Sequence, residues 1–180
     1  MPQTELIHKC IKGDSSAQKA LYTLFAGKLF AICLRYTKNR QEAEDWLQDA
    51  FVKIFQNLDK FKGEGSFEGW TKRITVNHIL SEYRKKKNQG SVLDIDDVLD
   101  LDDIQTSPHS ALLYEELITF INLLPEGKKL VFNLAVIEGY SHKEIAELLN
   151  ITEGASRGQL AKAREMLIQI HNKKNSIHAG

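Results

Sequence analysis

Residues 156–164 carry a set of hydrogen-bond donors suited to reading the edges of DNA bases. Arginine can bind guanine, and glutamine can bind adenine, through two hydrogen bonds, which makes Arg157 and Gln159 the strongest candidates. One such contact discriminates against a wrong base by about 1–3 kcal/mol. The full candidate set is Ser156, Arg157, Gln159, Lys162 and Arg164. The chemistry predicted here is therefore non-covalent recognition of duplex DNA.

Two short helices joined by a turn are needed to position these donors. Ser141 and Glu144 have the S-x-x-E spacing of a capping box at a helix start. Asn150, which tolerates left-handed backbone, is suited to end that helix, and Thr152 is suited to cap a second one. The inner face of the second helix is predicted to consist of Leu160, Ala163 and Leu167. This pattern predicts a helix-turn-helix, a unit that lays its second helix in the major groove. A helical hairpin that binds nothing is the alternative.

Gly158 lies inside the predicted second helix, where glycine costs about 1 kcal/mol relative to alanine. Close approach to a neighbouring backbone or to a groove wall would explain this glycine. Sequence drift would explain it equally well, so the residue alone does not decide between DNA binding and a plain hairpin.

A second candidate surface begins with a glycine-containing loop that carries the aromatic residues Phe61, Phe67 and Trp70. Aromatic side chains on a loop can stack on unpaired bases, which is worth about 1–3 kcal/mol per base, or they can seal the core. The interior role is favoured for Phe61 and Phe67, and both roles remain open for Trp70.

A basic helix is predicted to follow this loop, over residues 66–87. Small polar residues between Thr71 and Asn77 can reach base edges. The cations of the helix are Lys72, Arg73, Arg84, Lys85, Lys86 and Lys87. Cations beside an aromatic loop are typical of a nucleic-acid surface, although a charge run is more often a solvated face.

The helix predicted over residues 41–57 has acidic residues crowded into its first half, including Asp45 and Asp49. Acidic residues near a helix N-terminus interact favourably with the helix dipole, which is sufficient to explain the bias. A docking surface for a basic or polar partner is the alternative interpretation.

Catalytic, metal and membrane functions are not indicated. The only cysteines, Cys10 and Cys33, are far apart, and the six histidines lack metal-ligand spacing, so we expect neither a metal nor another cofactor. No nucleophile motif or phosphate-binding loop is present, which argues against an enzyme. We find no signal peptide and no run of about 18 apolar residues, and we therefore expect a cytoplasmic protein without membrane insertion.

The predicted fold class is all-α, with helical domains at residues 1–90 and 112–180. Residues 1–90 carry sixteen Lys+Arg against ten Asp+Glu, a net +6, and residues 117–180 carry a net +2. Between them, residues 91–116 carry a net −8. We interpret residues 91–111 as an acidic linker that serves as a solvated spacer or as a mimic of nucleic acid. The tail from Asn172 to Gly180 is polar, and we expect it to fray.

The chain resembles the small, two-domain, extracytoplasmic-function (ECF) group of bacterial RNA polymerase sigma factors. Residues 43–61 and 67–87 are similar to the second conserved region of that family, and residues 124–167 are similar to the fourth. The resemblance implies core RNA polymerase and promoter DNA, both duplex and melted, as partners. It also implies a linker threaded through polymerase channels, and an anti-sigma factor is a further candidate partner.

The resemblance also implies roles for individual residues. Asp45, Gln48 and Asp49 match positions that dock on the polymerase clamp helices. The second helix of the helix-turn-helix matches the reader of the minus-35 element. The matches to the region that opens the promoter and reads the minus-ten element are Trp70, Lys72, Arg73, Asn77 and Arg84.

Four positions depart from residues that are frequent in this family: Val76, Ser81, Ala155 and Gly158. They lie in or near both predicted DNA-reading helices, so the sequence of the promoter cannot be deduced. The small basic surplus of each domain predicts weak DNA binding by the free protein. The alternative function is an autonomous helix-turn-helix regulator with an N-terminal sensing or dimerisation domain.

Overall fold

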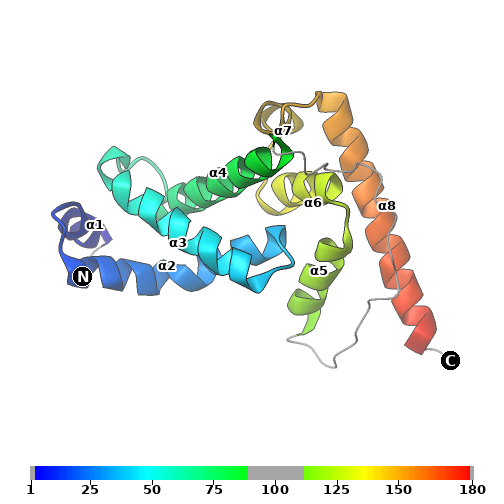
Figure 1. Ribbon diagram of the computed structural model, residues 1–180, viewed down its shortest axis with the longest axis horizontal. Coiled ribbons are helices and arrows are strands. Elements are labelled where there is room, and N and C mark those ends of the chain that lie inside the picture. Colours follow the sequence, from blue (N-terminus) through cyan, green and yellow to red (C-terminus); the bar gives the residue numbers. More distant parts are fainter. Residues whose placement is uncertain (1–2, 89–111, 179–180) are drawn as a thin grey trace. The chain divides into compact units, whose positions relative to one another are not determined.

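The computed structural model describes residues 3–88 and 112–178, and every regular element in these two ranges is a helix (Figure 1). The predicted all-α fold class is confirmed. The chain divides into two compact units, Met1–Lys86 and Lys87–Gly180. The predicted acidic linker, residues 91–111, lies outside the described residues. No helix within the described ranges is long and apolar enough to cross a membrane.

Unit 1 is built around α2, which packs against both α1 and α3. Its elements are α1 (Gln3–Ile11), α2 (Ser15–Tyr36), α3 (Arg40–Gln56), the 3-10 turn η1 (Leu58–Lys60) and α4 (Phe67–Asn88). The sequence predicts a serine cap for α2, Ser15 or Ser16, and this is wrong. Asp14 is the cap, because its side chain accepts a hydrogen bond of 2.9 Å from the backbone N–H of Ala17.

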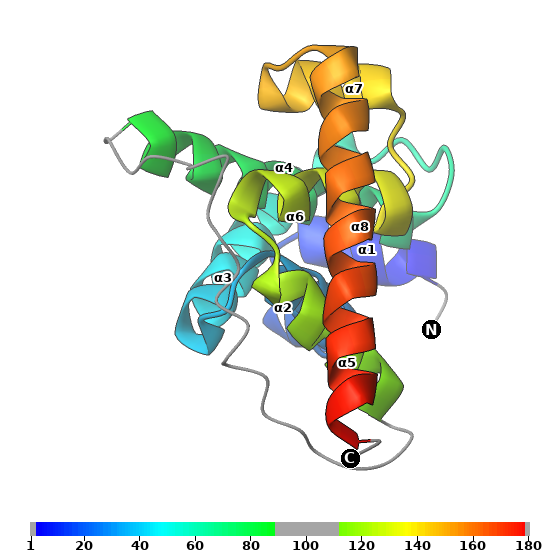
Figure 2. The same ribbon diagram turned by 90° about the vertical axis from the view of Figure 1, so that its right-hand side faces the viewer.

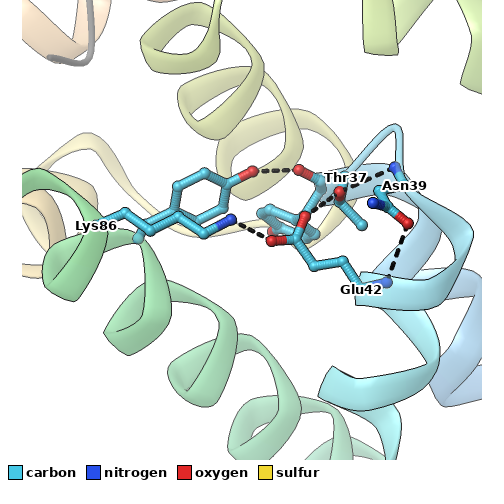
Figure 3. A network of polar contacts seen from close by, with 6 residues as sticks. Thr37, Asn39, Glu42 and Lys86 are labelled. Atoms are coloured by element: carbon cyan, nitrogen blue, oxygen red, sulfur yellow. Dashed lines mark hydrogen bonds and ion pairs between the residues drawn. The ribbon is translucent and has the colours of Figure 1, made fainter. Parts of the chain in front are cut away.

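A polar network fastens the end of α4 to the beginning of α3 (Figure 3). The Glu42 carboxylate accepts hydrogen bonds from the Lys86 ammonium and from the Thr37 hydroxyl. The Lys86 ammonium also lies 5.5 Å from the centre of the Trp46 ring, a cation–π contact. Because Lys86 and Glu42 are far apart in sequence, this network fixes the direction of α4 across unit 1.

Unit 2 is built around one long helix, α8, against which α5, α6 and α7 pack (Figure 2). Its elements are α5 (Leu112–Leu123), α6 (Glu126–Phe132), a π-helical turn (Asn133–Ile137), α7 (His142–Leu149) and α8 (Glu153–His178). The sequence does not predict the π turn. α8 continues to His178, through most of the tail that is predicted to fray from Asn172.

The helix-turn-helix is confirmed by α7, α8 and the turn between them. Both hydrogen bonds of the Ser141–Glu144 capping box are present. Asn150 ends α7 in the left-handed conformation, with φ at 54°. The Thr152 hydroxyl accepts a hydrogen bond of 3.0 Å from the N–H of Ala155 and caps α8. Local hydrogen bonds thus define both ends of the turn.

Candidate nucleic-acid interface

One side of α3 presents Asp45, Gln48 and Asp49 to solvent, and we call these three residues the acidic face. Their spacing of three and four residues places them together, opposite the buried side of the helix. Among the described residues, the Asp45 carboxylate accepts a hydrogen bond of 3.2 Å from the Gln41 amide, and the Asp49 carboxylate lies 3.6 Å from the imidazole of His78. Both carboxylates are exposed and therefore accessible to a partner.

An open pocket of about 400 Å³ adjoins the acidic face, between α2 and α3. Apolar and aromatic groups dominate its lining, and Gln48 belongs to both the pocket and the acidic face. The lining residues are Tyr22, Ala26, Gly27, Phe30, Glu44, Leu47 and Gln48. A partner that presents one cation and one apolar side chain would fit this combination.

Phe61, Phe67 and Trp70 form a ring cluster with Phe25 of α2. The predicted loop position is wrong for Phe67 and Trp70, because both lie in the first turn of α4. Phe67 is buried between Phe25, at a centroid distance of 5.5 Å, and Phe61, at 5.1 Å. Trp70 lies 5.5 Å from both Phe61 and Phe67 and remains half-exposed. The interior role predicted for Phe67 is confirmed, and Phe61 takes part in the same cluster.

Trp70 also lines an open pocket of about 310 Å³, which we call the Trp70 pocket. It brings together two of the predicted minus-ten residues, Trp70 and Asn77, on α4. The remaining lining residues are Lys53, Asn57, Lys60, Ile74 and His78. Sequence reasoning missed Lys53, near the end of α3, Asn57, which caps that helix, and Lys60, in η1. This lining suits a ligand that has a flat ring with hydrogen-bonding edges and a negative charge close to the ring.

The other predicted minus-ten residues lie outside the pocket. Arg73 and Arg84 are exposed on α4. The Lys72 ammonium is 2.9 Å from the Glu68 carboxylate, which also accepts a hydrogen bond of 2.5 Å from Lys28. The bonds from Lys28 and Lys72 lower the pKa of Glu68 to about 2. Lys72 is thus paired with Glu68 at the surface of its own helix, whereas Arg73 and Arg84 remain exposed.

His78 lies between the Trp70 pocket and the acidic face. Its side chain is buried, with Nε2 at 3.6 Å from Asp49 and Nδ1 at 3.9 Å from Glu82. Burial lowers the pKa of His78, and Lys53 and Lys85 add to that effect, while Glu82 and Asp49 oppose it. The neutral imidazole is therefore the form that the fold favours.

Acidification should destabilise unit 1 through His78. The pKa of His78 is lower in the folded state than in the unfolded chain, where histidine titrates near 6.5. The neutral form of His78 therefore contributes fully to the free energy of unfolding above the unfolded-state pKa. This contribution is lost as the pH falls through the lower pKa of the folded state. We expect His78→Gln to lose less stability than the wild type between pH 7.5 and 5.5.

Urea unfolding monitored by tryptophan fluorescence measures this, because both tryptophans, Trp46 and Trp70, lie in unit 1. His8→Gln, at an exposed position of α1, is the control and should behave as the wild type does. Equal losses in wild type and His78→Gln would contradict the assignment.

On α8 the predicted minus-35 residues fall into two groups. Arg157, Lys162 and Arg164 are exposed, and Arg157 is paired with Glu153 at 3.1 Å. Gln159 is half-buried, and its Oε1 finds no hydrogen-bond partner among the described residues. Ser156 differs from the others because it is fully buried and its Oγ lies 2.8 Å from Nδ1 of His142. Its hydroxyl therefore does not lie on the exposed side of the helix.

Gly158 is not required by packing within the described residues. A Cβ atom at this position would meet no heavy atom within 4 Å. Close approach to a neighbouring backbone among the described residues is therefore ruled out as its explanation, which leaves approach to an outside surface or sequence drift. Gly158→Ala should stabilise α8 by about 1 kcal/mol, since the substitution only improves helix propensity.

A thermal melt followed by circular dichroism tests this, with an expected rise of about 4–8 °C in the melting temperature of unit 2. Gly139→Ala is the matched control, because the φ of Gly139, 78°, is unfavourable for alanine. That variant should melt below the wild type. A melting temperature of Gly158→Ala at or below that of the wild type would show that the glycine serves the fold.

Comparison with known proteins identifies both units. The sigma-70 region 2 family matches residues 21–89, and the sigma-70 region 4 family matches residues 114–167. The ECF RNA polymerase sigma-E factor of Haemophilus influenzae is 30% identical over 174 residues, which cover 90% of this chain and 91% of that protein. The RNA polymerase sigma-H factor of Pseudomonas aeruginosa is 27% identical, over 91% of this chain and 90% of that protein.

The fold is also similar to that of a solved structure. The sigma factor RpoE from Bartonella quintana, determined in complex with the anti-sigma factor NepR, matches with a TM-score of 0.55 and 20% identity. The match covers 86% of this chain and 96% of that one. With two family matches in order along the chain and a relative that is similar over nearly its whole length, the chain belongs to the ECF group of the sigma-70 family of RNA polymerase sigma factors.

Proposed function

We propose that the chain directs core RNA polymerase to specific promoters, with a division of labour between its two units. Unit 1 docks on the polymerase and recognises the minus-ten element, and unit 2 recognises the minus-35 element. The observation that carries the proposal is that the family matches extend over both units. An autonomous helix-turn-helix regulator is not favoured, because such a regulator would not need a sigma-like unit 1.

The acidic face is the proposed docking surface for the polymerase. Its carboxylates, Asp45 and Asp49, are exposed and suit cationic side chains. The adjoining apolar pocket gives such a partner a place to bury one side chain. Together they supply a polar contact and an apolar contact on two neighbouring helices, α2 and α3.

The Trp70 pocket is the proposed site for a base of the melted minus-ten element. Trp70 offers a ring for stacking and Asn77 an amide for a base edge, while Lys53 and Lys60 supply positive charge for the phosphates. Arg73 and Arg84, exposed on α4, are proposed to contact the flanking backbone.

The minus-35 element is proposed to meet the exposed side of α8. Arg157 and Lys162 flank the line formed by Gly154, Gly158 and Ala161, as expected from 100° of rotation per residue. These small residues allow the helix axis to approach the groove floor, and Arg157 can then reach a base edge. Arg164 and Gln159 complete the proposed set, while Ser156 is assigned a different role below.

DNA binding by the free protein is expected to be weak. Two of the cations that the sequence analysis predicts to face DNA are already paired, Lys72 with Glu68 and Arg157 with Glu153. Few uncompensated cations per unit mean that few counterions are released on binding, and affinity falls accordingly. The polymerase is proposed to supply the missing affinity by holding both units on the promoter at once.

An anti-sigma factor is a proposed second partner. The similar sigma factor RpoE was solved together with one, which supports the same class of partner for this fold. A protein that covers the acidic face would compete directly with the polymerase and would keep the sigma factor inactive.

In vitro transcription tests the proposed function. Purified core RNA polymerase is combined with this protein and genomic fragments, and the RNA 5′ ends are mapped. We expect transcripts that begin at defined sites and that need both components. If addition of the protein produces no defined start site, the proposed function is wrong.

A further inference from the structure

We infer that His142 and Ser156 are positioning residues that set the rotation of the recognition helix α8 in the helix-turn-helix. The inference rests on the proposed reading of the minus-35 element by α8. The observation behind it is the hydrogen bond of 2.8 Å between Nδ1 of His142, on α7, and Oγ of Ser156, on α8. Neither residue would have to touch DNA to act in this way.

The bond connects two points that are themselves well fixed. His142 directly follows the helix cap Ser141, whose N–H donates a hydrogen bond of 2.8 Å to Glu144 and whose hydroxyl accepts one of 3.2 Å from the Glu144 N–H. Ser156 lies in the first turns of α8, with 0% of its surface exposed. A rigid helix start on α7 therefore holds a buried side chain on α8.

This bond matters because it is directional, whereas the other buried residues of the two helices make only non-directional contacts. Ile145 of α7 and Leu160 and Ala163 of α8 are apolar, and apolar burial is non-directional. Such contacts press the helices together but tolerate a small rotation of α8 about its axis. A hydrogen bond weakens steeply when its angle changes, so the His142–Ser156 bond restricts that rotation.

The residues that read DNA depend on this rotation. Arg157 is adjacent to Ser156 and is turned about 100° from it around the helix. Holding Ser156 against α7 therefore fixes the direction in which Arg157 leaves the helix, and also that of Lys162 on the opposite flank. A hydrogen bond between a bidentate arginine and a base edge needs such a fixed direction.

A role in stability alone predicts a different behaviour. A single hydrogen bond contributes only about 1 kcal/mol net, and apolar replacement of both partners is often nearly neutral for stability. If the pair only stabilised unit 2, its loss would lower minus-35 dependence only in step with the melting temperature of unit 2. A positioning pair instead lowers minus-35 dependence while unit 2 stays folded.

The experiment compares transcription from one mapped promoter with transcription from the same promoter carrying a scrambled minus-35 element. The ratio of the two rates measures minus-35 dependence in the reconstituted holoenzyme. We expect His142→Ala and Ser156→Ala each to lower that ratio by about tenfold, the loss of one directional contact. The double variant should fall no further, because each substitution breaks the same bond.

One further variant, together with Ser156→Ala, keeps the test decisive. His142→Asn retains a hydrogen-bonding atom near the position of Nδ1 and should restore most of the ratio. Ser156→Ala removes one oxygen and has the better helix propensity, so it remains informative if His142→Ala does not fold. Binding to core polymerase through unit 1 should be unchanged in every variant.

The outcomes separate this inference from the function on which it rests. A wild type that depends on its minus-35 element, with variants that depend on it equally, would overturn the positioning role alone. A wild-type protein that starts transcription regardless of the minus-35 sequence would overturn both the proposed reading by α8 and this inference. A fall in the ratio that is matched by a fall in the melting temperature of unit 2 would assign the pair to stability and would also overturn the inference.

Discussion

Charge reversal on the acidic face, Asp45→Lys together with Asp49→Lys, is expected to weaken binding to core RNA polymerase by at least about a hundredfold. Each substitution removes an attraction and adds a repulsion toward a cationic partner, and like charges across an interface cost several kcal/mol. The fold should persist, because both side chains are exposed and neither lies in the core. The measurement is the dissociation constant for core polymerase, obtained by fluorescence anisotropy of the labelled sigma factor.

The matched control reverses two other exposed acids of unit 1, Glu5→Lys on α1 and Asp59→Lys in η1. It makes the same change in net charge, so long-range electrostatics alter equally in both proteins. If the control and the acidic-face variant lose affinity to the same degree, binding depends on overall charge and α3 is not the docking site. Unchanged affinity of the acidic-face variant would exclude the site altogether.

Elements whose ends are defined by local hydrogen bonds could be predicted from the sequence to within a residue or two. The start and end of α7 follow from Ser141, Glu144 and Asn150, which act within their own turns. The cap of α2 lies one or two residues before the predicted Ser15 or Ser16, because aspartate and serine are both good caps and only the conformation of the chain selects between them. Gly13, with φ at 82°, makes the turn that leaves Asp14 at the cap.

Side-chain orientation that depends on tertiary contacts could not be predicted in this way. Ser156 is polar and lies beside Arg157, which favours an exposed position, yet His142 holds it inside the helix-turn-helix. The Trp70 pocket likewise needs α3 and α4 to meet, so no spacing within α4 alone reveals it. By contrast, the pairs Glu68–Lys72 and Glu153–Arg157 have the spacing of four residues that the sequence displays directly.

The π turn at Asn133–Ile137 is a third kind of feature. Its residues have ordinary helical periodicity, and the sequence predicts an uninterrupted helix that Gly139 closes. One extra residue is accommodated in the turn, and the hydrogen bond from the N–H of Glu138 returns to the carbonyl of Asn133. Such turns often occur at functional sites, but no residue type marks this one in advance.

Trp70→Leu should separate the two roles of this residue, which packs in the ring cluster and lines a pocket open to solvent. Leucine keeps an apolar side chain against Phe61 and Phe67 but removes the ring on which a base can stack. Loss of one stacked base costs about 1–3 kcal/mol, so we expect promoter opening to fall roughly fivefold to a hundredfold. The permanganate reactivity of unpaired thymines in the minus-ten element measures opening directly.

Phe25→Leu is the control, because Phe25 belongs to the same ring cluster, is buried on α2 and does not line the Trp70 pocket. Both substitutions shorten an aromatic side chain in one cluster, and urea unfolding gives the stability that each has lost. If opening depends on the stability of unit 1, the two variants will lose opening in proportion to that loss. If Trp70 stacks on an unpaired base, only Trp70→Leu will lose more promoter opening than its loss of stability explains. Equal opening in both variants would assign the Trp70 ring to a packing role in the core.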